Sequence, residues 1–186
     1  MQTRYYRMPS TMILFLLLKF AVLAQCGSER WEVKTLQDAE AGDINFTPVI
    51  STVHKQLKFA KPGYHEVNPR DITEKKAYRI DCILIKYKLE EDKDWHLVVQ
   101  DLNTNEQMVV EIPDPACVDM NNPRFNKLIL ARKRLVAKVG PVKADYRKPP
   151  PNTKIRITGV GFFDKENHPI GFKGREIHPA LNLVLL

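Results

Sequence analysis

Residues 95–112 read WHLVVQDLNTNEQMVVEI, and this stretch decides the fold. Two largely apolar runs, residues 95–102 and 107–113, flank a polar centre, which is the pattern of two antiparallel strands joined by a short turn. Every second position from 95 to 99 and from 108 to 112 is apolar, so one face should contact a core while the other combines polar groups with Val98 and Val109. The stretch therefore predicts a β-hairpin at the centre of a mainly β domain.

The register of this hairpin follows from its core-facing side chains. The aliphatic side chains that should share the core face are Leu97, Val99, Met108, Val110 and Ile112. Pairing Val99 with Val110 keeps them together and leaves residues 104–105 as a two-residue turn. In that register, His96 and Glu111 are diagonal neighbours on the opposite face.

The segments around the hairpin complete the predicted fold. Residues 78–87 alternate as a long strand, and residues 123–139 carry apolar side chains at helical spacing. After the proline connector 149–151, strands are expected at residues 154–164 and 177–186. This order predicts a mainly β fold, a five-stranded OB-like barrel with one helix between strands 3 and 4. A small α+β sheet is the alternative.

The start of the chain has the features of a secretory signal peptide. Arg4 and Arg7 provide a positive beginning, and residues 12–24 form an apolar run that Lys19 interrupts once. The run is shorter than the ~20 apolar residues that cross a bilayer. We therefore expect residues 1–24 to be a cleaved signal peptide, with a retained N-terminal anchor as the alternative.

The remaining chain is long enough for one domain with an extension. Residues 25–72 have weak periodicity and several Gly and Pro residues, so we expect an N-terminal extension packed on the domain. Residues 73–186 should form the OB-like β-barrel domain. Export would place the protein in the periplasm or the outer envelope.

The chain has three cysteines. Because an oxidising compartment favours disulfides, we expect Cys82 to pair with Cys117, both of which lie within the folded domain. Two buried thiols are the alternative. Cys26 follows Leu-Ala-Gln at the export junction, and it is the candidate for lipidation, which would anchor the protein to a membrane.

The charge of the chain is moderately basic. The formal net charge is +7, but residues 1–24 hold three basic residues and no acidic one, so the remainder has 26 basic and 22 acidic residues. Basic residues gather in residues 123–156, where Asp145 is the single acidic residue. The candidate ligand-binding residues are Arg132, Arg134, Lys138, Arg147, Lys148 and Arg156. They predict an oligonucleotide, an acidic glycan or a lipid surface as the partner, and a solvated helix face is the alternative.

Histidines and carboxylates form a second candidate site. The candidates for metal binding are His96, Glu111, Glu176 and His178. Glu176 and His178 are two residues apart on an expected strand, so their side chains share a face. Such groups could hold a divalent metal or act as general acids and bases, although the chain has no HExxH, DxDxDG or CxxC spacing. The alternative is structural, with His96 bonded to a neighbouring carboxylate.

Several stretches resemble a group of small exported bacterial proteins. They are ERWEVKT at 29–35, DWHLVVQD at 94–101, EIPDPAC at 111–117, TGVGFFD at 158–164 and EIHP at 176–179. The resemblance implies export, paired cysteines and a single compact domain, and it implies no particular activity. Residues 165–175 depart from the Gly- and Asn-containing loop of that group, so the resemblance assigns no role to His168.

Together these features predict an exported envelope protein that acts as a non-catalytic binding module for an anionic ligand. A metal-dependent hydrolase or nuclease that uses the His/Glu cluster is the alternative. No serine lies in a Gly-x-Ser-x-Gly motif, which argues against a serine hydrolase of that type. We expect a monomer that has no cytoplasmic partner and no cofactor. The hydrolase or nuclease alternative would require a divalent metal.

Overall fold

The structure is a computed structural model that describes residues 26–27, 29–63, 69–164 and 174–186. The expected signal peptide, residues 1–24, lies outside the described residues, and so does His168. Within those ranges, no helix has both the length and the apolar character needed to span a bilayer. The elements in chain order are α1 (Trp31–Lys34), η1 (Ala41–Asp43), β1 (Asn45–Ser51), α2 (Val53–Gln56), β2 (Lys76–Leu89), β3 (Trp95–Asp101), β4 (Gln107–Ile112), η2 (Pro115–Cys117), α3 (Phe125–Val139), β5 (Lys154–Phe163) and β6 (Arg175–Leu185).

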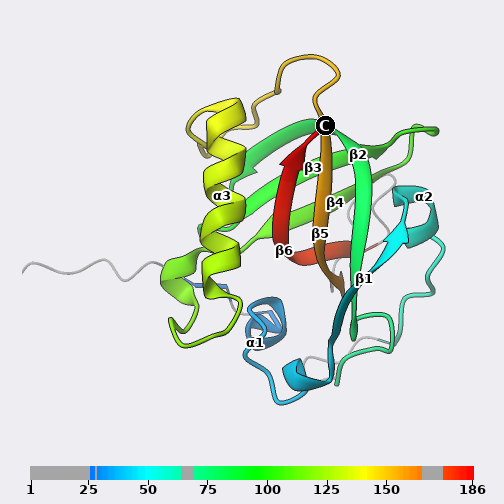
Figure 1. Ribbon diagram of the computed structural model, residues 1–186, viewed down its shortest axis with the longest axis vertical. Helices are drawn as coiled ribbons and strands as arrows, with labels where there is room; N and C mark the ends of the chain where they lie inside the picture. The colour runs from blue at the N-terminus through cyan, green and yellow to red at the C-terminus, as the bar shows by residue number, and fades with distance from the viewer. Residues whose placement is uncertain (1–25, 28, 64–68, 165–173) are drawn as a thin grey trace, which may run out of the picture.

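Five of the strands form a closed barrel (Figure 1). They follow the order β2-β3-β4-β6-β5, and β5 pairs with β2 to close the ring. Neighbouring strands are antiparallel except β4 and β6, which are parallel. In the chain, α3 lies between the third and fourth barrel strands. The predicted OB-like barrel with its helix is therefore confirmed.

A sixth strand comes from the segment expected to be an extension. β1 pairs in parallel with β2 and adds an edge to the sheet outside the barrel. Most of its side chains are exposed, and it contains Pro48. A proline is tolerated there because an edge strand has one side without ladder hydrogen bonds.

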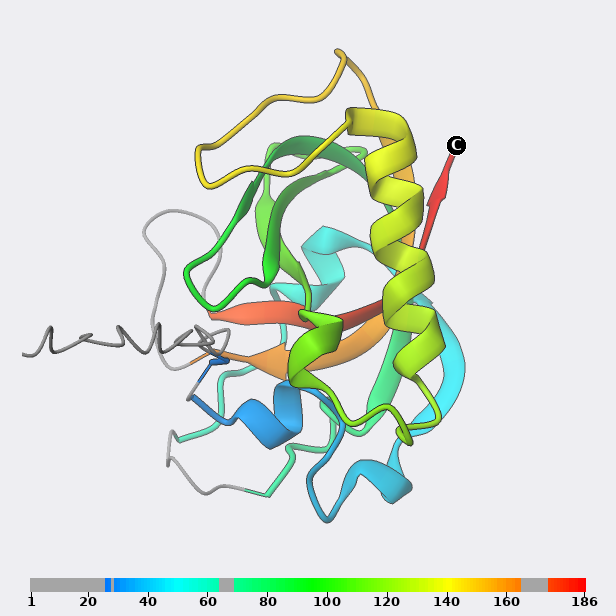
Figure 2. The same ribbon diagram turned by 90° about the vertical axis from the view of Figure 1, so that its left-hand side faces the viewer.

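Helix α3 packs along one side of the barrel against β6 (Figures 1 and 2). Leu128, Ala131 and Leu135 recur at helical spacing and are buried. The helix begins at Phe125, two residues after the predicted start, and ends before Gly140, whose positive φ of 75° suits a residue without a Cβ. The predicted amphipathic helix is thus confirmed.

The hairpin register differs from the predicted one by two residues. Val99 pairs with Met108 rather than with Val110. The turn is longer than two residues because the carboxylate of Asp101 accepts a hydrogen bond from the backbone N–H of Asn103, as in an Asx turn. A shift of two residues leaves every side chain on its predicted face, and all five expected core-facing side chains are buried in the barrel core.

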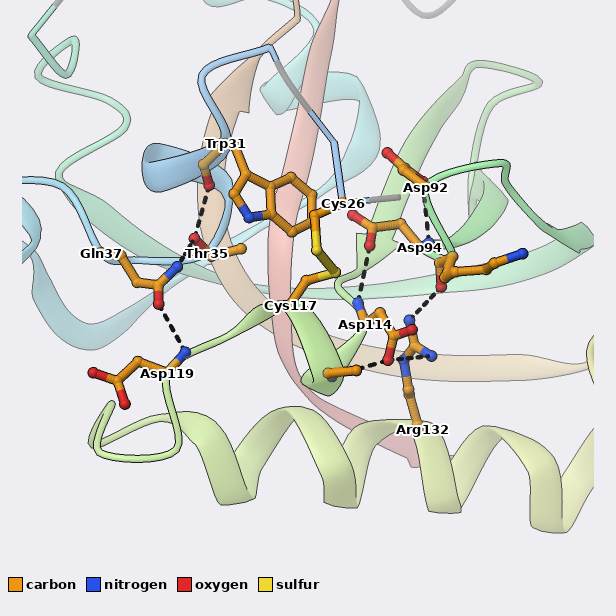
Figure 3. The surroundings of a disulfide bond; sticks show 12 residues. Cys26, Trp31, Thr35, Gln37, Asp92, Asp94, Asp114, Cys117, Asp119 and Arg132 are labelled. Atoms are coloured by element: carbon orange, nitrogen blue, oxygen red, sulfur yellow. Dashed lines mark hydrogen bonds and ion pairs between the residues drawn. A yellow bond between two sulfur atoms is a disulfide. The ribbon is translucent and has the colours of Figure 1, made fainter. Parts of the chain in front are cut away.

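The disulfide joins Cys26 to Cys117, so the predicted pairing of Cys82 with Cys117 is wrong (Figure 3). Cys82 lies inside the barrel on β2, where its Sγ is 3.8 Å from the carbonyl oxygen of Ile155 and burial raises the pKa of its thiol. Cys117 lies outside the barrel in η2, beside the N-terminal segment. Because the bond uses the sulfur of Cys26, lipidation of that residue is not supported. Disulfides are typical of proteins outside the reducing cytoplasm.

Replacing Cys117 with serine should lower the free energy of unfolding by about 3–5 kcal/mol, because the crosslink restricts a long loop in the unfolded chain. The two cysteines are separated by 91 positions. Urea denaturation without reductant measures the change. The variant Cys82→Ala keeps the crosslink and is the control. Unfolded wild-type protein should show one titratable thiol, and three thiols would contradict the assigned pairing.

Candidate functional site

Three neighbouring strands bring the predicted metal candidates to one face of the sheet. His96 on β3 lies directly opposite Glu111 on β4, instead of on a diagonal, because of the two-residue difference in register. Glu176 on β6 lies opposite Val109 in the parallel pairing, and His178 follows two residues later. These side chains lie on the opposite face from the core-facing side chains of the same strands.

The four predicted side chains form one connected cluster. Nδ1 of His96 lies 2.8 Å from Oε1 of Glu111, and Oε2 of the same carboxylate lies 3.1 Å from Nδ1 of His178. That ring nitrogen of His178 is also 3.9 Å from Oε2 of Glu176. Glu111 therefore occupies the centre and presents one oxygen to each histidine.

The turn before β3 adds two carboxylates that were not predicted. Oδ2 of Asp94 lies 3.3 Å from Nε2 of His178, and Oε1 of Glu90 lies 3.2 Å from Nδ1 of His96. The backbone N–H of Glu90 donates to the carbonyl of Asp94 and closes the turn. Oδ1 of Asp94 accepts a hydrogen bond from the backbone N–H of Asp114 (Figure 3). The acidic residues of this turn were the feature of the sequence that could have identified Glu90 and Asp94 as members of the cluster.

Most of the cluster is shielded from solvent, with exposed fractions of 0% for Asp94 and His178, 1% for Glu176 and 5% for His96. Burial alone would lower the pKa of His178, but the surrounding carboxylates outweigh it and hold that pKa well above its ordinary value. Burial alone would raise the pKa of Glu111, yet the two histidines hold it well below its ordinary range. The cluster is therefore strongly coupled electrostatically.

Several buried polar atoms in this cluster lack hydrogen bonds. Among the described residues, neither ring nitrogen of His178 has a partner with hydrogen-bond geometry, and neither does Oδ2 of Asp94. Leaving such a group unsatisfied costs about 1–3 kcal/mol, and a bound water or ion is one of the recognised explanations. A cation could supply a partner for only one of the two ring nitrogens, because Nδ1 faces Glu111 whereas Nε2 faces Asp94.

A cavity of about 780 Å³ opens beside the cluster, and His96, Glu111 and Cys26 are part of its wall. Among the described residues of the wall, carboxylates outnumber ammonium groups: the acidic residues are Glu29, Glu90, Glu91, Asp92, Glu111 and Asp164, and the lysines are Lys34, Lys88 and Lys93. The excess of negative charge favours a cation and opposes direct binding of an anion.

The predicted basic ligand-binding residues are partly engaged within the protein. Arg132 donates to two backbone carbonyls, Arg156 forms a two-pronged ion pair with Asp81, and the guanidinium of Arg134 donates to the side chain of Asn182. The other three are exposed, at the end of α3 and in the connector that follows it: Lys138, Arg147 and Lys148. Of the six predicted ligand-binding residues, only Lys138, Arg147 and Lys148 therefore form an exposed basic group.

The metal-free protein should be most stable in mildly acidic solution. Because the pKa of His178 is raised, its protonation stabilises the fold fully below its unfolded pKa of about 6.5, and this contribution is lost as the pH rises through the folded value. The lowered pKa of Glu111 has the opposite sign, so its contribution is lost as the pH falls below about 4.5. The free energy of unfolding in EDTA should peak between about pH 4.5 and 6.5.

Urea titrations across this pH range test that expectation. Glu111→Gln should flatten both sides of the profile, since it removes the charge that couples the two histidines. His54→Ala is the matched control, because His54 contacts Glu106, 2.5 Å away, outside the cluster. A profile unchanged by Glu111→Gln would contradict the assigned coupling.

Comparison with known proteins finds no match for this chain: no family model, no curated protein and no solved structure. The resemblance to exported bacterial proteins therefore stays a prediction, and the function has to be inferred from the cluster and its surroundings.

Proposed function

We propose that this chain is an exported protein of the cell envelope, a metal-dependent hydrolase that holds a divalent cation at the cluster centred on Glu111. The observation that carries the proposal is the state of His178. Its ring is fully buried, three carboxylates lie within 3.9 Å of its nitrogens, and neither nitrogen makes a hydrogen bond within the described chain. Imidazole and carboxylate groups are the usual ligands of zinc and related ions.

The separations of the ligand atoms suit a shared ion. Two atoms bound to one ion by bonds of about 2.1 Å lie about 3.0 Å apart at a right angle and about 3.4 Å apart at the tetrahedral angle. Nδ1 of His96 lies 2.8 Å from Glu111 and 3.2 Å from Glu90. Small side-chain adjustments would place these atoms around one cation.

The charge balance also favours a cation. Asp94, Glu111 and Glu176 are buried together, and burying carboxylates is costly unless positive charge compensates them. The two histidines could compensate at low pH by taking up protons. A divalent ion could do so at neutral pH, where its ligands release those protons.

The cavity gives a bound ion access to water and leaves space for a substrate, both of which a hydrolytic site needs. Catalytic metal sites keep a coordination position for water, whose pKa falls to about 7 on zinc. His96 and Glu111 lie at the cavity wall, so an ion held there would face solvent. Water bound to it could attack a substrate in the cavity.

This proposal takes the metal-dependent alternative over the anionic-ligand binding module. The described residues of the cavity wall carry more negative than positive charge, while three of the six basic candidates are engaged within the protein. Export is part of the proposal because the Cys26–Cys117 bond and the apolar N-terminal run both fit an oxidising compartment.

Purified protein should contain a divalent metal, zinc by ligand type, detectable by inductively coupled plasma mass spectrometry. His178→Ala and Glu111→Gln should each weaken zinc binding by at least about 10–100-fold in calorimetric titrations, because each removes a ligand. His54→Ala removes a histidine from the exposed pair with Glu106 and should bind zinc like the wild type. Wild-type protein that binds no divalent metal would overturn the proposal.

Hydrolysis is tested separately, with chromogenic carboxylic and phosphoric esters in the presence and absence of EDTA. We expect turnover that EDTA abolishes and added zinc or manganese restores. Binding of metal without hydrolysis of any such ester would reject the catalytic part of the proposal and leave a metal-binding protein.

A further inference from the structure

We propose that helix α3 holds this protein against an anionic lipid surface, with its lysines at the headgroups and Leu130 among the acyl chains. The inference goes beyond the proposed hydrolysis and does not depend on a bound metal. It draws only on the proposed envelope location, where the protein meets lipid headgroups. Its basis is the charge, the exposure and the spacing of the side chains on one face of the helix.

Helix α3 is basic along its whole length. Its 15 residues include no acidic residue, and the basic ones are Lys127, Arg132, Lys133, Arg134 and Lys138. The connector that follows the helix extends this charge with Lys143, Arg147 and Lys148, all of them exposed. Basic clusters of this kind are attracted to anionic lipids.

The lysines of α3 gather around one exposed leucine. Residues three and four positions apart are neighbours on a helix surface, so Leu130 lies between Lys127 on one side and Lys133 on the other. Lys138 continues the same face toward the end of the helix. Leu130, Lys127, Lys133 and Lys138 are all exposed, whereas Leu128 and its neighbours in the apolar stripe pack on the barrel. This outer face of the helix is therefore open to a partner.

The three lysines are available for contacts outside the protein. Within the described part of the chain, no side chain of Lys127, Lys133 or Lys138 forms an ion pair or a hydrogen bond. In contrast, Arg132 and Arg134 donate to groups of the barrel. A lysine ammonium on its flexible stem can reach the phosphate of a lipid headgroup while the helix stays packed on the barrel.

The leucine at the centre of this face favours a membrane over a nucleic acid. Leu130 is 45% exposed in the isolated chain, and its side chain would leave water by entering the acyl region. Single-stranded nucleic acid is usually bound by aromatic side chains that stack on its bases. The aromatic residue of α3 is Phe125, which packs inward against an apolar cluster. Lysines around an aliphatic side chain therefore fit a lipid surface better.

Vesicle binding by the full mature chain tests the inference. The probe is vesicles of phosphatidylglycerol and phosphatidylcholine in equal parts, and vesicles of pure phosphatidylcholine are the uncharged reference. The protein should sediment with the anionic vesicles and not with the reference. Raising the salt concentration from about 0.1 M to about 1 M should release most of it, because the screening length falls from about 10 Å to about 3 Å.

Replacing Lys127, Lys133 and Lys138 together with glutamine should weaken binding to the anionic vesicles on the order of 100-fold, since each lysine near such a surface contributes about fivefold. The matched control replaces three exposed lysines outside α3 and changes the net charge equally: Lys55, Lys58 and Lys76. Two of them belong to α2 and the turn after it, on a different side of the barrel from α3 (Figure 1). The control should keep nearly all of the binding, and equal losses in both variants would overturn the role of α3.

Leu130→Ser separates insertion from charge. It should weaken binding by about tenfold, since a buried leucine side chain gains at least that much on leaving water. Leu102→Ser, at a leucine of the hairpin turn that is 42% exposed, is its control and should bind like the wild type. Unchanged binding of Leu130→Ser would overturn the insertion.

Two further outcomes would overturn the lipid surface as the partner. One is a wild-type protein that stays in solution with anionic vesicles at low salt, and the other is tighter binding to a single-stranded oligonucleotide than to the vesicles. Because all substituted side chains are exposed, circular dichroism should show that every variant folds. The variants should keep the zinc content and ester hydrolysis of the wild type, so failure of this inference would leave the proposed function standing.

Discussion

The parallel pairing of β4 with β6 is the constraint on which both the barrel and the candidate site depend. It joins Val109 to Glu176 and Val110 to Ile177, and it completes the ring of five strands. Val110 and Ile177 enter the barrel core from this seam. Because side chains alternate along a strand, the packing that orients these aliphatic groups inward also sets Glu111 beside His178 on the other face. The apolar core thus determines where the polar cluster lies.

The cluster works against the stability of the fold unless its charges are compensated. Asp94, Glu111 and Glu176 lie where water is largely absent, and removing water from an ion costs several kcal/mol. Burial and the charge of Glu111 raise the pKa of Glu176, which favours its neutral form. Protonated histidines compensate part of that cost, which is why the pKa of His178 is raised. Groups held at such a cost typically have a functional role, because an apolar replacement would usually stabilise the fold as well or better. The proposed cation would offset part of the buried charge and would supply a partner for one of the two ring nitrogens of His178.

The N-terminal segment is part of this architecture and not a loose appendage. The Cys26–Cys117 bond attaches it beside the cavity, and Cys26 itself lines the wall. Arg30 forms a buried ion pair with Glu74 at 2.8 Å and also reaches the backbone of Phe163 at the end of β5. These contacts place α1, with Lys34, against the cluster. Oxidation of the two cysteines therefore stabilises one wall of the cavity, which ties the proposed activity to the compartment in which a disulfide can form.

The local pattern of the sequence was sufficient for the five barrel strands, helix α3, their order and the side chains that face the core, because periodicities of 2.0 and 3.6 depend on neighbouring residues alone. It also placed His96, Glu111 and His178 on polar faces. It did not predict β1 as a strand. Only the tertiary structure decided three things: the register, which Asp101 shifted by capping the turn; the partner of Cys117; and the arrival of Asp94 beside His178. The register is a choice between turn geometries of similar energy. The Cys26–Cys117 bond and the contact of Asp94 with His178 join segments that are distant in the chain. Alternation of residue types contains no information on the turn geometry or on contacts between distant segments, which the folded chain alone brings together.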